Sequence, residues 1–82
     1  MNELHIDLLI GLRAAKQYGL DVPTLLVDLR RGRHRDLAQP QLEQALRSLA
    51  DDSFATTFTT VLKSKRWRIT ALGESALQEA SL

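Results

Sequence analysis

The 82-residue chain contains no cysteine, two prolines, four glycines and four aromatic residues. Without cysteine, neither a disulfide nor a thiolate metal site can hold the fold together, so an apolar core must do so alone. The hydrophobic fraction of 44% and the charged fraction of 26% are ordinary for a globular protein and exclude the composition of a disordered chain. The length suits one domain with a single small core, and we expect residues 1–82 to form that domain.

Long apolar runs are also missing. No segment approaches the roughly 20 apolar residues that a membrane-spanning helix needs. The chain begins MNELHID, with acidic residues where a secretory signal would carry Lys or Arg. We therefore expect a cytoplasmic protein.

Motifs that carry catalytic chemistry are absent as well. There is no glycine-rich phosphate loop, no pair of carboxylates at a catalytic spacing and no set of metal ligands. His34 and Asp36 lie two residues apart in a polar link, without a nucleophile spaced to match, and we interpret His5 as a surface residue. The sequence predicts that the protein is not an enzyme and uses no cofactor.

Net charge is only +1, but the positive charge is unevenly distributed. Of the eleven Lys and Arg residues, four lie within residues 30–35 and four within residues 63–68. Two basic clusters in a nearly neutral chain indicate local patches rather than a general polycation. Each cluster is either a solvated loop or a contact surface for an anionic partner.

Residues 2–52 have the hydrophobic period of helices. The first helix is predicted from Asn2 to about Gly19, with these apolar residues on one side: Leu4, Leu8, Leu12, Ala15 and Tyr18. Pro23 fits the first turn of a second helix that stops at Gly32. A polar link leads to Pro40, where a third helix should begin, because residues before proline avoid the α region. That helix should end near Asp52.

The period changes to two after the third helix. Residues 54–62, FATTFTTVL, and residues 66–70, RWRIT, have the composition and alternation of strands. The polar KSKR between them predicts a hairpin near residues 56–70, with Trp67 on the opposite side from Arg66 and Arg68 and buried beneath the hairpin. Thr70 can cap a last helix that runs to about Ala80. The expected order is helix, helix, helix, strand, strand, helix, an α+β fold that is mostly α.

This order resembles the winged helix-turn-helix family over nearly the whole chain. The resemblance is strongest in LEQALRSLADDSF, residues 42–54, and RWRITALGESAL, residues 66–77. In the family, the first kind of stretch is the recognition helix and the turn into the wing, and the second is the return strand with a Thr-x-x-Gly start to a closing helix. Here those four positions are Thr70 to Gly73, whereas Ser53 replaces the glycine that the family usually has after the recognition helix.

The resemblance implies double-stranded DNA as partner and transcriptional regulation as task. The third helix would enter the major groove, and the basic wing would lie on the phosphate backbone or tip into a minor groove. Gln side chains suit adenine edges, and Arg suits guanine or a phosphate. The expected DNA-binding residues are Gln41, Gln44, Arg47 and Ser48 on the helix, Arg33 and Arg35 in the link, and Lys63, Lys65, Arg66 and Arg68 on the wing.

An adaptor that uses the same fold to bind protein is the alternative, because function belongs to sites rather than folds. Ile6 and Ile10 motivate it, since they lie one turn apart on the otherwise polar side of the first helix. These residues either form the centre of a contact with a partner or a second copy in a homodimer, or are covered by the C-terminal helix.

Overall fold

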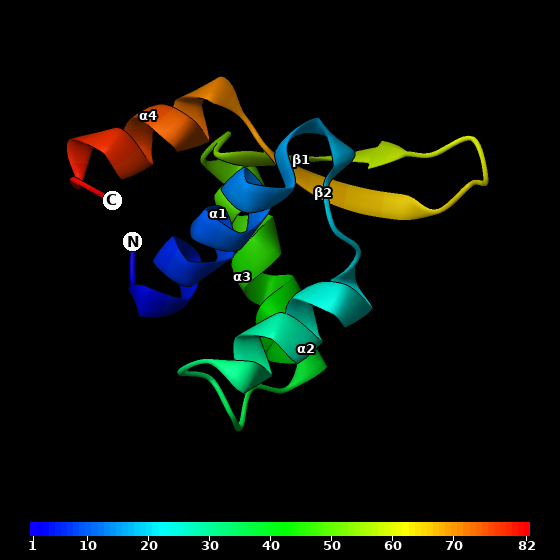
Figure 1. Cartoon of the computed structure of the whole chain (residues 1–82), viewed down its shortest axis with the longest axis horizontal. Helices are drawn as coiled ribbons and strands as arrows, with labels where there is room; N and C mark the ends of the chain where they lie inside the picture. The colour runs from blue at the N-terminus through cyan, green and yellow to red at the C-terminus, as the bar shows by residue number, and fades with distance from the viewer.

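The computed structural model covers residues 1–82 and has a mostly helical α+β fold (Figure 1). Its elements are α1 (Glu3–Ala15), a 3₁₀ turn (Lys16–Tyr18), α2 (Val22–Arg31), α3 (Gln39–Asp51), β1 (Ala55–Thr59), β2 (Lys65–Ile69) and α4 (Ala71–Glu79). The predicted order of helices and strands is confirmed. No helix combines the length and the apolar character needed to cross a membrane.

The core is built mainly from leucine and is centred on α1, which packs against α2, α3, α4 and β2. Full burial of one leucine side chain contributes about 1.5–3 kcal/mol, so the ten leucines of this cluster provide most of the apolar stabilisation of the fold. Leu37 belongs to the core although it lies in the link that the sequence indicates to be polar. The buried residues are Leu8, Leu9, Leu12, Leu25, Leu29, Leu37, Leu42, Ala45, Leu46, Leu49, Ala55, Trp67 and Leu77.

The first helix ends earlier than the sequence indicates. Lys16 has a positive φ of 53°, which breaks α1 after Ala15 and leads into the 3₁₀ turn. Tyr18 therefore leaves the helical period and is 69% exposed, so its predicted place on the buried stripe is wrong. The chain then reaches β2, where Leu20 and Trp67 exchange two backbone hydrogen bonds of 2.8 Å.

Local side chains and prolines determine where the helices begin. Asn2 accepts a hydrogen bond from the His5 amide at the start of α1, and Asp21 accepts one from the Thr24 amide at the start of α2. Pro23 lies in the first turn of α2, as predicted. α3 begins at Gln39, one residue before the predicted start, with Pro40 in its first turn.

The hairpin is confirmed, but its turn lies earlier in the chain than KSKR. β1 and β2 pair antiparallel from Ala55 opposite Ile69 to Thr59 opposite Lys65, so β1 stops three residues before the end of the predicted strand. The turn occupies residues 60–64, and its left-handed residue is Lys63, with φ of 63°. Trp67 is 7% exposed, which confirms its predicted burial. The hairpin projects away from the helices (Figure 1).

The residues around Ser53 join the start of β1 and the end of β2 to the neighbouring helices. Ser53 takes a left-handed conformation, φ 64°, at the end of α3, where glycine is common. Its amide donates to Ala50 and the Phe54 amide donates to Leu49, which satisfies the last carbonyls of the helix. Thr70 Oγ1 donates to the Ser53 carbonyl at 2.6 Å and accepts from the Gly73 amide at 3.0 Å, so one hydroxyl joins the end of α3 to the start of α4.

Candidate nucleic-acid interface

The outward face of α3 carries exposed polar side chains because its leucines point into the core. Gln44 and Arg47 are both exposed, as predicted, and Asp51 follows them at the C-terminal end of the helix. Ser48 is half-buried. An exposed amide and an exposed guanidinium about one turn apart can both reach base edges from one side of a helix.

Gln41 has a structural task in addition to its exposed position. Ala38 has no side-chain acceptor, and the Gln41 Oε1 accepts a hydrogen bond from the Ala38 amide at 2.9 Å. This contact satisfies one of the free amides at the start of α3. The acceptor oxygen of Gln41 is thus engaged, and its Nε2 is free to donate. A bidentate contact with adenine would need both atoms.

A groove between α3 and the hairpin brings together residues from three elements. Arg47 and Glu43 of α3 line it together with Lys65 of β2, and its floor includes Val22 and Trp67. Arg47 and Lys65 place two cations along one channel. Glu43 adds a negative charge to the groove, and it is not among the residues that the sequence predicts for the outer face of α3. This groove is the one place where the predicted helix and hairpin residues meet.

The four predicted hairpin cations do not share one face. Side chains alternate along a strand, so Lys65 lies on the side of Trp67, with its Nζ 5.5 Å from the Trp67 ring centroid. Arg66 and Arg68 lie on the opposite side of β2. Arg66 donates to the Tyr18 carbonyl at 3.3 Å.

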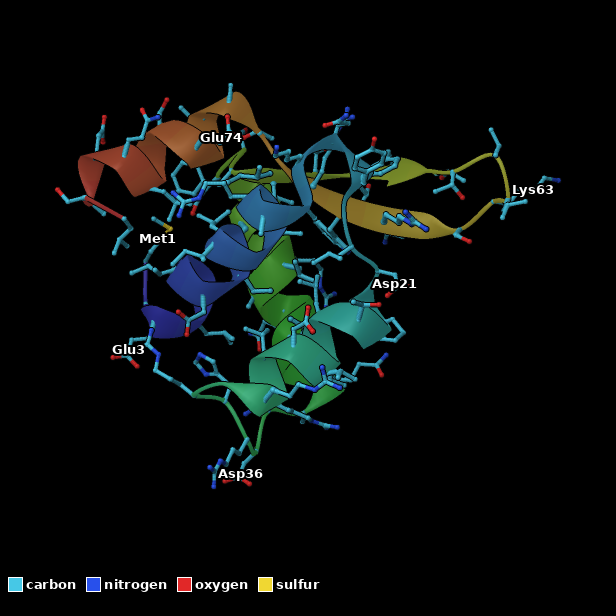
Figure 2. The ribbon with its side chains drawn as sticks, in the orientation of Figure 1. Met1, Glu3, Asp21, Asp36, Lys63 and Glu74 are labelled. Atoms are coloured by element: carbon cyan, nitrogen blue, oxygen red, sulfur yellow. The ribbon has the colours of Figure 1, made fainter.

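The other two of these cations have different surroundings. Arg68 lies over the Phe58 ring, 5.1 Å from its centroid. Lys63 is exposed in the turn, and Figure 2 shows it at the far end of the hairpin. Lys65 is therefore the hairpin cation that faces α3.

The link between α2 and α3 contains the second basic cluster, and the structure gives two of its arginines internal partners. Arg30 Nε donates to the Leu37 carbonyl at 2.9 Å. Arg33 donates to both carboxylate oxygens of Asp7, at 2.8 and 3.2 Å, although the sequence suggests no structural partner for it. Arg35 is exposed and lines a depression with Gln41 at the start of α3.

The carboxyl group of Asp7 is the acceptor that anchors this link to α1. Its pKa is lowered, mainly by the hydrogen bond from Arg33, with a further contribution from His34, whose Nε2 lies 2.7 Å from Asp7 Oδ2. Burial opposes the shift. The same pair raises the pKa of Arg33. Sequence reasoning missed Asp7 because its partners are 26 and 27 residues away.

Ile6 and Ile10, the predicted partner contact, are half-buried and pack against the core. Ile10 also lines a cavity between α1 and α2 with Leu25 and Leu29. These positions reduce the apolar area available to a partner, and the homodimer stays a prediction.

No group of three or more His, Asp or Glu side chains is placed to hold a metal ion. Comparisons of the chain with protein-family models, with curated proteins and with solved structures find no match. The geometry and the charge of the interface are therefore the basis for the functional inference.

Proposed function

We propose that this protein is a winged helix-turn-helix protein that binds double-stranded DNA and regulates transcription. In this proposal α3 occupies the major groove and the hairpin is the wing, in contact with the phosphate backbone. The observation that carries the proposal is the groove in which Arg47 of α3 and Lys65 of β2 lie together. A phosphate backbone passing between helix and hairpin would meet both cations.

The element order supports the winged assignment. Three helices, a hairpin and a closing helix follow one another, and the Leu20–Trp67 bridge adds a short third strand position beside β2. In helix-turn-helix proteins the exposed face of the second helix of the motif reads base edges. Here α3 offers Gln44 for an adenine and Arg47 for a guanine or a phosphate.

Charge placement on β2 provides a matched pair of variants that tests the proposal. Lys65→Ala and Arg68→Ala each remove one positive charge from the same strand, but only Lys65 faces α3. We expect Lys65→Ala to weaken binding to every duplex and to make the slope of log K against log salt shallower by about 0.9. Arg68→Ala should leave both the affinity and the slope close to those of wild type. Fluorescence anisotropy with a labelled mixed-sequence duplex at several salt concentrations measures both quantities.

Glu43 provides a second test, in which the variant should bind DNA more tightly than wild type. Its carboxylate lies in the same groove, where it would repel a phosphate, so Glu43→Gln should strengthen binding and steepen the salt dependence. Glu79→Gln, at the end of α4, makes the same change in net charge outside this groove and serves as the control.

Two results would contradict the proposal. If Lys65→Ala and Arg68→Ala weaken binding equally, the protein responds to total charge and the groove is not the DNA site. If wild type binds no duplex more tightly than about 10⁻⁴ M at physiological salt, below ordinary non-specific affinity, DNA is not its partner. The second result would favour the protein-binding adaptor.

A further inference from the structure

The end of the hairpin carries two aliphatic side chains that nothing in the fold covers. Val61 is 98% exposed and Leu62 is 86% exposed, the highest values among the large apolar residues of the chain. Single exposed apolar residues are normal on protein surfaces. Two adjacent ones in the hairpin turn need another explanation; they directly precede Lys63, which Figure 2 shows at the far end of the hairpin.

The turn itself does not need these side chains. The Lys63 amide donates to the Thr60 carbonyl at 2.8 Å, and the Thr60 amide donates to the Ser64 carbonyl at 2.9 Å. Thr60 Oγ1 also accepts from the Ser64 amide at 3.2 Å. Val61 and Leu62 occupy the two central positions, where polar residues, proline and glycine are usual. The hydrogen-bonded frame holds both side chains outward at the tip.

All charged side chains in the hairpin, and in the residues that flank it in the sequence, are positive. Residues 53–73 contain four Lys and Arg residues and no Asp or Glu. Lys63 is adjacent to Leu62, and Lys65 begins β2 two residues later. A partner that suits this tip is strongly anionic on the outside and offers an apolar surface within reach. Stacked base pairs between two phosphate backbones have this combination.

We propose that Val61 and Leu62 insert as a wedge between base pairs from the minor groove and bend the duplex, an inference that rests on the proposed DNA binding. Val61 lies two residues beyond Thr59 of the last strand pair, Thr59–Lys65, and Leu62 follows it; two residues span about 7 Å at the rise of a strand. This reach is close to the roughly 7.5 Å depth of the minor groove. With Lys65 at the backbone, the tip reaches the edge of a base step. Apolar side chains at such a position unstack the step and kink the DNA.

The wedge is tested with a duplex of about 30 base pairs that carries a donor and an acceptor dye at its ends and 2-aminopurine at successive central steps. Wild type should raise the energy transfer between the ends and the 2-aminopurine fluorescence at one or more steps. The combined variant Val61→Ser and Leu62→Ser should bind without either signal. We expect its affinity to change by less than about tenfold, because the wedge contact and the energy of deforming the DNA disappear together.

Leu72→Ser is the matched control. Leu72 is an exposed leucine in the first turn of α4, outside the hairpin, and this variant should bend DNA as wild type does. The tip substitutions lie on fully exposed side chains, so circular dichroism and thermal melting should show an unchanged fold.

Each outcome separates the wedge from the proposed function. If wild type binds the duplex but changes neither signal, or if the tip variant bends it equally, the wedge is wrong and DNA binding stands. If wild type binds no duplex, both are wrong. If vesicles of phosphatidylserine and phosphatidylcholine capture wild type but not the tip variant, while the duplex stays straight, the tip binds anionic lipid and the wedge is overturned.

Discussion

Gly19 shows how a single residue without a side chain places the hairpin against the helices. Its φ is 66°, and a Cβ atom there would lie 2.4 Å from the Trp67 carbonyl oxygen and 2.8 Å from the Phe58 ring. The close approach lets the next residue, Leu20, pair with Trp67 in β2. Gly73 has a similar role at the start of α4, where a Cβ would lie 2.2 Å from the Phe54 carbonyl oxygen. This close contact at Gly73 is a physical reason for the glycine in the Thr-x-x-Gly sequence, residues 70–73.

Alanine substitutions at two glycines should therefore have opposite effects. Gly19→Ala adds a side chain at a left-handed position that already touches backbone, and we expect a loss of at least about 2 kcal/mol. Gly11→Ala is the control, because it lies within α1 with no atom within 4 Å of the added Cβ. It should stabilise the protein by about 0.5–1 kcal/mol. Urea unfolding measures both, and equal effects of the two variants would contradict the close approach at Gly19.

At the scale of elements, the seven-residue link between α2 and α3 is ordered by side chains rather than by a tight turn. Leu37 is buried in the core, Arg30 holds the Leu37 carbonyl, and Arg33 with His34 holds Asp7 of α1. These contacts determine the start of α3 relative to α1. The ionised carboxylate of Asp7 thus helps to hold the link that leads into the candidate reading helix, in addition to the leucine packing of α3.

Acid should weaken this anchor. The folded pKa of Asp7 lies below its unfolded value of about 3.9, because the charged form is hydrogen-bonded to Arg33. A lowered folded pKa contributes stability that is present above the unfolded pKa and is lost as the pH falls through the folded pKa. Asp7→Asn should therefore be less stable than wild type at pH 7, and the difference should shrink below about pH 4.

The measurement is the urea midpoint of both proteins at pH 7, 5 and 3. Asp36→Asn is the control, since Asp36 lies in the same link, is exposed and forms no ion pair. A gap between Asp7→Asn and wild type that stays constant from pH 7 to pH 3 would show that the carboxylate charge does not stabilise the fold.

At the scale of the whole molecule, the proposed DNA binding bears on the predicted homodimer. Helix-turn-helix proteins commonly bind two half-sites as dimers, so their two-fold symmetry matches that of the site. Ile6 and Ile10 are the predicted contact, but both are half-buried, so an interface centred on them buries little additional surface. Small interfaces are weak and transient.

We expect a homodimer of this kind to depend on concentration. Sizing with light scattering should give a mass near the monomer value of 9.2 kDa at low micromolar concentration and approach twice that value when concentrated. Ile6→Glu combined with Ile10→Glu should remain monomeric. Tyr18→Glu, a change at an exposed residue of the 3₁₀ turn, is the control. A constant monomer mass for wild type up to about 1 mM would exclude this dimer, and unfolding of the double variant would assign both isoleucines to the core.

Much of the fold could be predicted from local patterns. The leucine spacing in α2 and α3, Pro23 and Pro40 in first turns, and the alternation around Trp67 all depend on residues within a few positions of one another. The helical and strand periods act at that range, and burial of one face follows from them. The end of α1 was harder to predict, because Lys16 leaves the helix under constraints that come from the approach of Gly19 to β2.

The candidate site was predicted only as a set of residue types. The sequence alone determined that α3 has a polar outer face with Gln44 and Arg47, and that the hairpin is basic, because composition and period are local properties. Only the tertiary structure decided that Lys65 faces α3, while Arg33 is bound to Asp7 from 26 residues away and Arg66 to Tyr18 from 48 residues away. Such pairings depend on how the elements pack. A single contact between residues far apart in the sequence produces no repeating pattern from which it could be predicted.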